Sequence, residues 1–362
     1  MFKTGKLNVV QLRGTFHQMG RQFGRLLSSE FKELYDIAVD RYLLKQRGKS
    51  FDALRTEARA LFDPYPERFK QVIYGMAETS GLDLDRHIVL NAVELLTISA
   101  FAESLPGAGR CSGIAAWGPY TGGGPLLYGR NYDLCGVKQL FRDMAKFWTV
   151  AVFNPTGSCV PVASLNYPGV LYLQTGMNRR GLFLALNNGE LSGGSVGFAS
   201  RIPTLIQTFT FLLDSASMEE LDAHFNTTRS SASYIINVAD RQAAFSYEWP
   251  TFDLRRRGGA GLMVATNDFA DPTWGLPQPP ASAASDSRTR RDNLTSLAAI
   301  HRGKIDPRRM MEILDLPLDK GGATFPAGTI YQVVGVPEQL KLWIKVPDFQ
   351  DWTEIDLGPL FD

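Results

Sequence analysis

The sequence is poor in the residues that form disulfides and metal sites. It has only three cysteines, Cys111, Cys135 and Cys159, and four scattered histidines in 362 residues. Three thiols cannot all pair, and neither residue type occurs at the spacing of zinc ligands. These scarcities exclude a disulfide scaffold and a zinc site of the usual kind.

The chain also lacks an excess charge and a long apolar run. Its 38 lysines and arginines nearly balance 37 acidic residues, so no overall field attracts nucleic acid or an anionic membrane. The most apolar stretches, such as residues 202–213, are too short and too polar to span a bilayer. The first residues lack the apolar core of a secretory signal, so we expect a cytoplasmic protein, or an exported one if a signal was removed. The expected partner is therefore a small molecule that binds in a pocket, and a homo-oligomer is compatible with this composition.

The chain has two regions with different hydrophobic patterns. Residues 17–103 repeat apolar side chains at helical spacing, and after a Pro- and Gly-rich loop at 105–110 short β-type segments alternate with turn residues. Strands are expected at 112–117, 125–128, 147–154, 160–164, 169–174, 181–187, 233–237, 243–249, 262–265, 329–334 and 340–345, and later helices at 201–217, 218–226, 286–301 and 307–314. This order favours an α+β fold of stacked antiparallel sheets with outer helices over a parallel βαβ sheet.

Cys111 is the candidate nucleophile. A lone cysteine at the start of a strand is most often a small buried hydrophobe. Here, however, a hairpin of the strands 112–117 and 125–128 would bring Arg130 and Asp133 back beside it. A guanidinium favours the reactive thiolate, and a carboxylate can hold an amine.

No histidine stands where it could act as the base. An α-amino group, with a pKa of about 7.7–8.0, would serve if the chain were cut between Arg110 and Cys111. The amine of the new terminus would then lie within reach of its own sulfur.

Five ordered segments carry a resemblance to a known family. Cys111-Ser-Gly followed by Gly129-Arg-Asn-Tyr-Asp133 resembles the N-terminal nucleophile (Ntn) hydrolases related to acyl-coenzyme A:6-aminopenicillanic acid acyltransferase and to choloylglycine (bile salt and penicillin V) hydrolases. The other segments similar to this family are Leu12 to Gly24, Gly176 to Asn188, Ala265-Thr-Asn-Asp268 and Asp286-Ser-Arg288. One departure is Arg110, where the acyltransferase branch typically has glycine before the cut.

The resemblance implies a four-layer αββα sandwich and a self-cleaved chain. Residues 1–110 would be a helical N-terminal segment that remains as a partner fragment, and residues 111–362 the catalytic core. Cys111 would form an acyl-enzyme from an amide or thioester, with coenzyme A thioesters as co-substrates if transfer dominates. No metal or organic cofactor is implied.

The resemblance also assigns roles to further residues. Arg130 would lie against the sulfur, and Asp133 would hold the freed amine. Asn267 would donate to the oxyanion, Asn188 would help to bind the carbonyl, and Arg288 would orient Asp133 or the substrate. Asn187 competes with Asn188, and Arg290 and Arg291 compete with Arg288.

Two rival interpretations remain. Gly193-Gly-Ser195-Val-Gly197 matches the nucleophile elbow of α/β-hydrolases, as does Gly109-Arg-Cys111-Ser-Gly113 with cysteine in place of serine. An elbow joins a strand directly to a helix, whereas Ser195 follows a predicted loop and Cys111 precedes a predicted strand. The other rival is a binding module in which the cysteine is incidental.

Overall fold

The computed structural model describes residues 1–362 except 103–109, 135, 137, 196–200, 277–280 and 362. The strands are β1 Phe2–Thr4, β2 Leu7–Gly14, β3 Ser112–Ala116, β4 Leu127–Asp133, β5 Thr149–Pro155, β6 Val162–Asn166, β7 Thr175–Asn178, β8 Phe183–Asn188, β9 Tyr234–Ala239, β10 Ala244–Trp249, β11 Arg255–Arg257, β12 Leu262–Ala265, β13 Thr329–Val336, β14 Lys341–Val346 and β15 Gln350–Asp356. The α-helices are α1 Phe16–Leu26, α2 Ser28–Tyr35, α3 Phe51–Phe62, α4 Glu67–Thr79, α5 Leu84–Asn91, α6 Val93–Ala102, α7 Lys138–Met144, α8 Thr204–Asp214, α9 Met218–Thr227, α10 Ala281–Ile300 and α11 Pro307–Asp315. A π-helix, η1, spans Asp36–Gln46, and short 3₁₀ turns are η2 Ala145–Phe147, η3 Glu190–Ser192, η4 Leu318–Lys320, η5 Pro337–Gln339 and η6 Gly358–Leu360.

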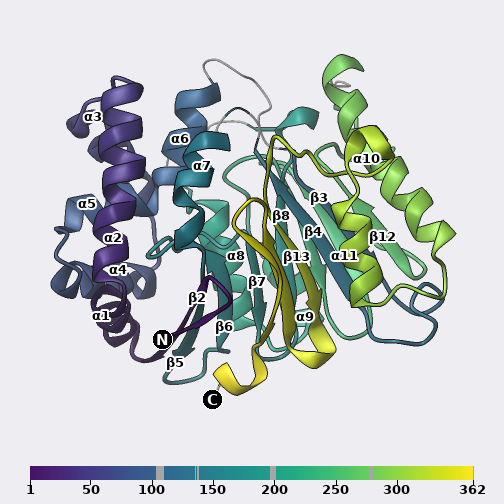
Figure 1. The fold of residues 1–362 in the computed structure, drawn as a ribbon, viewed down its shortest axis with the longest axis horizontal. Coiled ribbons are helices and arrows are strands. Elements are labelled where there is room, and N and C mark those ends of the chain that lie inside the picture. Colours follow the sequence, from purple (N-terminus) through teal and green to yellow (C-terminus); the bar gives the residue numbers. More distant parts are fainter. Residues whose placement is uncertain (103–109, 135, 137, 196–200, 277–280, 362) are drawn as a thin grey trace.

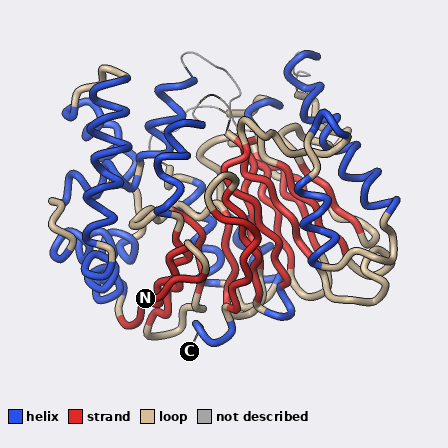
Figure 2. The backbone as a smooth tube through the Cα atoms, viewed as in Figure 1, coloured by secondary structure: helices blue, strands red, loops and turns tan. Residues whose placement is uncertain are grey.

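The strands form two sheets in the middle of the molecule, with helices around them (Figure 1, Figure 2). The nine-stranded sheet has the order β1-β2-β5-β6-β7-β8-β9-β10-β11, and the six-stranded sheet has the order β12-β3-β4-β13-β14-β15. Neighbouring strands are antiparallel except β2 and β5, which pair in parallel between Asn8–Gly14 and Thr149–Pro155. The predicted α+β fold with two largely antiparallel sheets is confirmed.

Helix starts follow from local hydrogen-bonding chemistry. Thr15 and Gln18 form a reciprocal capping box at α1, and Ser50, Asp83, Ser217 and Asp306 each accept a main-chain N–H at the start of α3, α5, α9 and α11. Each cap satisfies a donor that the first helical turn leaves free. Each of these helices therefore begins directly after a residue whose side-chain oxygen can cap it.

The layers are held by apolar faces on both sides of each sheet. On the outer face of the six-stranded sheet, Ile114 and Leu127 pack with Leu294 of α10 and Met310 of α11. On its inner face, the ring of Tyr128 lies 4.9 Å from that of Phe183 in the other sheet. On the outer face of the nine-stranded sheet, Phe153 meets Phe23 of α1 and Phe209 of α8. The order of layers is thus helix, sheet, sheet, helix.

The N-terminal segment is not only helical. Its strand β2 lies between β1 and β5 inside the nine-stranded sheet, where Leu7, Val9, Val10 and Leu12 are fully buried. Residues 1–110 therefore contribute two strands to the sheet whose other strands come from residues 111–362.

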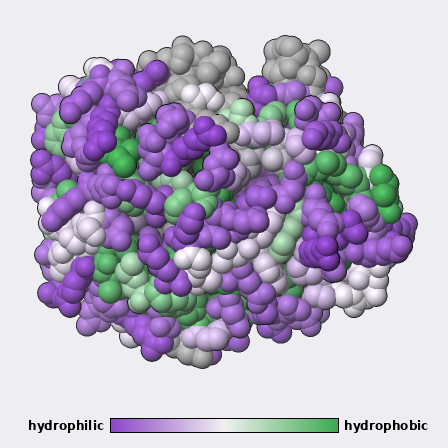
Figure 3. All heavy atoms as spheres, viewed as in Figure 1, coloured by the Kyte–Doolittle hydropathy of each residue, from purple (hydrophilic) through white to green (hydrophobic). Residues whose placement is uncertain are grey.

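Some predicted elements were wrong. The expected strand at 169–174 is a buried loop, and the strand lies at Thr175–Asn178 instead. Strands β1, β2, β11 and β15 and helix α7 were missed. The face seen in Figure 3 is mostly hydrophilic with small scattered hydrophobic areas. No helix in the described part of the chain is long and apolar enough to span a bilayer.

Candidate active site

Most of the predicted site residues gather where β3 begins and where β4 and β12 end. Strands β3 and β4 pair antiparallel, with Ser112 opposite Asn131 and Gly113 opposite Arg130, so the start of β3 meets the end of β4. Strand β12 pairs with the other side of β3, with Ala265 opposite Gly113, and therefore ends at the same edge. The predicted hairpin is confirmed, although β4 continues through Asp133 instead of ending at residue 128.

Arg130 lies against the thiol of Cys111. Its Nη2 is 3.9 Å from Cys111 Sγ and donates to the carbonyl oxygen of Leu186 at 2.6 Å, while Nη1 donates to that of Gln174 at 2.8 Å. Both carbonyls belong to the opposite sheet or the loop that leads into it. The guanidinium thus bridges the two sheets and is fully buried beside the sulfur.

The pKa of the Cys111 thiol is raised and not lowered, contrary to the expectation from the neighbouring guanidinium. Cys111 is 3% exposed, and burial raises its pKa above the ordinary value. The charges of Arg130 and Arg290 and a main-chain hydrogen bond from Asp133 act in the lowering direction, while the Asp133 carboxylate raises the pKa further. Desolvation outweighs the guanidinium, because burial disfavours any charged form.

Asp133 is the carboxyl of this cluster that could accept a proton. Its Oδ1 accepts a hydrogen bond from the hydroxyl of Thr329 at 2.6 Å, and its Oδ2 has no partner among the described residues. Burial raises its pKa to about 7, against the lowering effects of Thr329, Arg290 and Arg130. A carboxyl with this pKa exchanges protons near neutral pH.

Arg290 contacts the peptide bond between Arg110 and Cys111, where cleavage is predicted. Its Nη1 donates to the carbonyl oxygens of Arg110 at 2.6 Å and Cys111 at 2.8 Å, and its Nη2 donates to Oδ1 of Asn267 at 3.0 Å. Arg290 is 1% exposed, and the side chain of Arg110 pairs with Asp286 on the same helix. A cationic donor therefore touches the carbonyl that Cys111 would attack.

The structure places Arg288 and Asn188 differently from this cluster. Arg288 is half exposed, and its Nε lies 3.9 Å from a carboxylate oxygen of Asp268, so Arg290 and not Arg288 faces Asp133. The side chain of Asn188 accepts the main-chain N–H of Glu190, while its carbonyl accepts from Nδ2 of Asn267 at 2.8 Å.

Asn187, the alternative to Asn188, is fully buried and donates to the carbonyl of Thr266 at 3.0 Å. Its side chain, not that of Asn188, faces the end of β12. The site that the structure assembles is therefore Cys111, Arg130, Asp133, Asn267 and Arg290.

The arrangement around Ser195 does not match an elbow. Strand β8 ends at Asn188, η3 follows, and helix α8 begins only at Thr204. Ser195 is exposed in between, and its hydroxyl accepts the main-chain N–H of Ser233. Separately, no group of three His, Cys, Asp or Glu side chains suited to a metal ion occurs among the described residues.

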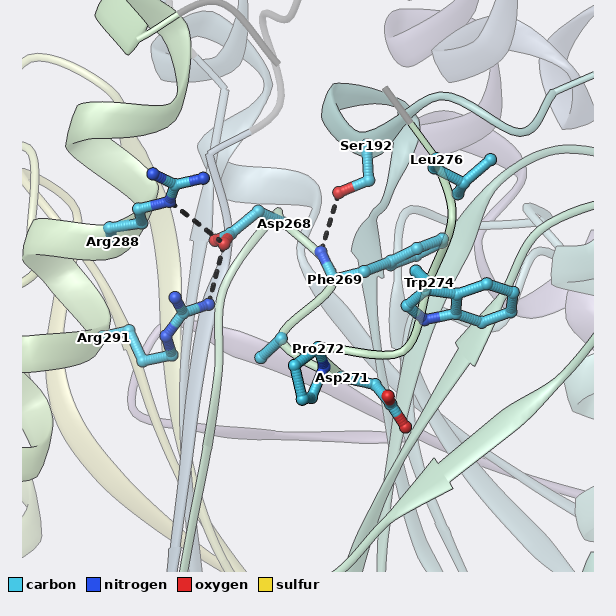
Figure 4. A pocket seen from close by; sticks show the side chains of 10 residues that line it. Ser192, Asp268, Phe269, Asp271, Pro272, Trp274, Leu276, Arg288 and Arg291 are labelled. Carbon is cyan, nitrogen blue, oxygen red and sulfur yellow. Dashed lines mark hydrogen bonds and ion pairs between the residues drawn. The ribbon is translucent and has the colours of Figure 1, made fainter. Parts of the chain in front are cut away.

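A pocket of about 190 Å³ adjoins the end of β12. Figure 4 shows Arg288 and Arg291 from α10 converging on Asp268 at one side and Phe269 and Trp274 at the other. The loop after β12, which lines the pocket, is held by the fully buried Glu248. The Glu248 carboxylate accepts hydrogen bonds from the main-chain N–H of Ala270 at 2.7 Å and from Nε1 of Trp274 at 2.6 Å. This pocket begins one residue after Asn267, and Cys111 itself does not line it.

The chain matches no protein-family model and no curated protein. Among solved structures it is similar to an N-acylethanolamine-hydrolyzing acid amidase ortholog from Caenorhabditis elegans, with 17% identity, a TM-score of 0.43, and coverage of 63% of this chain and 93% of that one. It is also similar to a conjugated bile acid hydrolase from Clostridium perfringens, with 14% identity, a TM-score of 0.49, and coverage of 70% and 94%. A penicillin V acylase from Agrobacterium tumefaciens gives 12% identity, a TM-score of 0.42, and coverage of 68% and 86%.

Proposed function

We propose that this chain is a self-processing cysteine amidohydrolase of the Ntn type, cut between Arg110 and Cys111. It would act on C–N amide or thioester bonds through an acyl-Cys111 intermediate, and transfer to an amine would use the same intermediate. The observation that carries the proposal is the contact of Arg290 with the Arg110 carbonyl beside the buried thiol. The uncut peptide bond occupies the place where a substrate carbonyl would lie.

The cleavage step follows from the chemistry of neighbouring atoms. Asp133 takes the thiol proton, and Sγ attacks the carbonyl carbon of Arg110, closing a small ring. Arg290 stabilises the resulting oxyanion, and such preorganised donors usually make the largest contribution to catalysis. The C–N bond then breaks, the nitrogen takes the proton, and a thioester joins Arg110 to Cys111.

One water molecule completes maturation. It hydrolyses the thioester, which leaves a carboxylate on Arg110 and a free thiol and α-amine on Cys111. The two fragments are residues 1–110 and 111–362. In turnover the new amine acts as the base, since its pKa of about 7.7–8.0 lies closer to neutral pH than that of a lysine.

The side chain of Arg110 does not oppose this cut. It forms an ion pair with Asp286 of α10, and its guanidinium lies 5.3 Å from the centre of the Phe325 ring. Its main-chain N–H donates to the carbonyl of Asp133 at 3.0 Å. These contacts hold the peptide in place without a glycine.

Intact mass spectrometry of the purified protein tests the proposal. We expect two fragments that divide between Arg110 and Cys111 and whose masses sum to one water more than the whole chain. Cys111→Ala should stay whole and fail to hydrolyse a series of N-acyl p-nitroanilides. Ser195→Ala is the matched control and should cleave normally. A whole wild-type chain that hydrolyses amides, or a Cys111→Ala chain that still cleaves, would refute it.

A further inference from the structure

A buried carboxyl from the N-terminal segment reaches the strand that carries the site. Glu94 lies on α6, the last helix before the proposed cut, and is 5% exposed. Its Oε1 accepts a hydrogen bond from the hydroxyl of Tyr132 on β4, and its Oε2 has no hydrogen-bond partner among the described residues. The mechanism above gives this group no role.

Tyr132 connects Glu94 to the thiol. It stands two residues after Arg130 on β4, so both side chains point to the same face of the sheet. The Arg130 guanidinium lies 5.3 Å from the centre of the Tyr132 ring and 5.9 Å from that of Tyr331, and these two rings stack at 4.8 Å. A continuous set of contacts therefore runs from Glu94 through Tyr132 and Arg130 to Cys111 Sγ.

Arg130 needs such support because of where it lies. It is fully buried, its hydrogen-bond acceptors among the described residues are the Gln174 and Leu186 carbonyls and the sulfur, and its Nε has no partner there. A buried guanidinium is costly unless charge and contacts offset it. Glu94 is coupled to that charge, because Arg130 lowers the pKa of the Glu94 carboxyl.

We propose that Glu94 is a positioning residue for the reaction at Cys111, supplied by the N-terminal segment and acting through Tyr132 on Arg130. The proposal rests on the function proposed above. It makes residues 1–110 part of the working active site and not only a segment to be removed. Loss of this contact should misplace the guanidinium relative to the sulfur.

The surroundings of Glu94 define its protonation. On β4, Tyr132 and Arg130 face Glu94, and Gln174 faces it from the loop after β6. Four more tyrosines interact with it electrostatically: Tyr167, Tyr172, Tyr234 and Tyr331. Burial raises its pKa to about 7, while Gln174 and Arg130 lower it. Above that pH the carboxylate offsets the charge of Arg130, and below it the guanidinium acts on Sγ without that offset.

Three variants separate positioning from mere packing. Glu94→Ala removes the acceptor, Tyr132→Phe removes only the hydroxyl, and Glu94→Gln keeps an acceptor but cannot ionise. We expect the first two to slow self-cleavage about 10- to 100-fold, the scale of misplacing a catalytic group by about 1 Å. The double variant Glu94→Ala/Tyr132→Phe should be no slower than the slower single variant.

The pH profile provides the readout that a packing role would not move. Alkylation of mature Cys111 by iodoacetamide, followed by mass spectrometry of the tryptic peptide, should have a lower pH midpoint in Glu94→Gln than in wild type. Glu94→Gln should also cleave at nearly the wild-type rate at pH 6. Ser80→Ala is the matched control, since Ser80 and His87 form a buried contact of 2.5 Å within the N-terminal segment and away from β4.

The outcomes are distinct. If Tyr132→Phe and Glu94→Ala cleave like wild type, or if Glu94→Gln leaves the alkylation midpoint unchanged, the role of Glu94 is refuted while the proposed function stands. If Cys111→Ala still cleaves, the proposed function itself fails. If Glu94→Ala does not fold, Tyr132→Phe and Glu94→Gln decide the question alone.

Discussion

Replacing Arg290 should slow self-cleavage far more than replacing its neighbours on α10. The Arg290→Lys variant keeps a positive charge but replaces a fork that donates to the Arg110 and Cys111 carbonyls and to Asn267. A lysine ammonium is a point charge that cannot reproduce this planar geometry. Loss of one oxyanion donor costs about 10²–10³ in rate, or roughly 2.7–4 kcal/mol, and we expect about the lower value for lysine.

The neutral Arg290→Met variant should be slower again. Arg290 is one of the charges that lower the pKa of Asp133, which burial has already raised to about 7. Without that charge the Asp133 carboxyl would hold its proton to still higher pH, so less of it would accept the thiol proton. The loss of the oxyanion donor and the loss of the base would then act together.

The assay is cell-free synthesis of the chain, quenched over time and resolved by denaturing gel electrophoresis. Arg291→Lys and Arg288→Lys are the controls, because both side chains face Asp268 instead of the scissile peptide. Substitutions of side chains outside the site usually change the folding free energy by less than about 0.5 kcal/mol, so these controls should cleave within about twofold of wild type. The reasoning is wrong if Arg290→Met is folded, as judged by circular dichroism, and still cleaves at the wild-type rate.

Three further predictions concern the titration of Asp133, the pairing of β2 with β5 and the packing of Gly20. The pKa of Asp133 is raised from 3.8 to about 7, so its stabilising contribution is present below its unfolded pKa and is lost as pH rises to about 7. Urea titrations of the uncut Cys111→Ala chain should therefore lose up to about 1.4 kcal/mol per pH unit from this group across that window, and adding Asp133→Asn should remove that slope. After cleavage, residues 1–110 should co-elute with the larger fragment in native gel filtration and separate only in denaturant, because β2 is paired with β5 along seven residues; early separation would contradict this packing. Gly20→Ala should lower the free energy of unfolding by about 1–3 kcal/mol in a thermal or urea melt, because its Cβ would lie 2.1 Å from the carbonyl oxygen of Val72 on α4. Gly48→Ala is the control: no atom lies near its Cβ, so it measures only the effect of a side chain on the backbone conformation.

Much of the fold could be predicted where interactions between residues close in the sequence determine the structure. The capping box of Thr15 and Gln18 and the apolar period after it identify α1 without any tertiary information. The incorrect strand at 169–174 shows the opposite case. Its main chain is satisfied by Asn91, by the Leu205 carbonyl of α8 and by the side chain of Asn166, so it is buried without a sheet partner. A sequence pattern records burial but not which partner takes the hydrogen bonds.

Strand β2 was missed for a related reason. Its parallel partner β5 comes much later in the chain, so no hairpin turn indicates that the two strands pair. Strand β15, with half-exposed polar residues at the sheet edge, lacks the apolar alternation of a core strand. The pairing of β2 is therefore not local in the sequence, whereas β15 pairs with the preceding strand β14 and was missed because of its polar, half-exposed residues.

The choice between Arg288 and Arg290 could have been made from helical spacing. Leu294 and Ala298 follow Arg290 at intervals of four and are fully buried against the six-stranded sheet, so Arg290 shares their face. Arg288 is followed at that spacing by Asp292, on a solvent-facing row. The choice between Asn187 and Asn188 had no such signal, because β8 is buried on both faces and its residues 183–186 are all apolar.

The raised pKa of Cys111 changes what the site chemistry requires. In the uncut chain the thiol is desolvated, and its available acceptor is a carboxyl with a pKa of about 7. Proton transfer from the thiol to Asp133 is then uphill, so in the proposed mechanism the first cut depends on the oxyanion donor Arg290 more than on a thiolate that is already present. After the proposed cut, an α-amine, whose ordinary pKa is about 7.7–8.0, would lie on the same residue as the sulfur. In the proposed mechanism a base next to the sulfur therefore arises only as a product of the first reaction, so the uncut protein should be a poor catalyst toward other amides and the cut one a better catalyst by the same thiol.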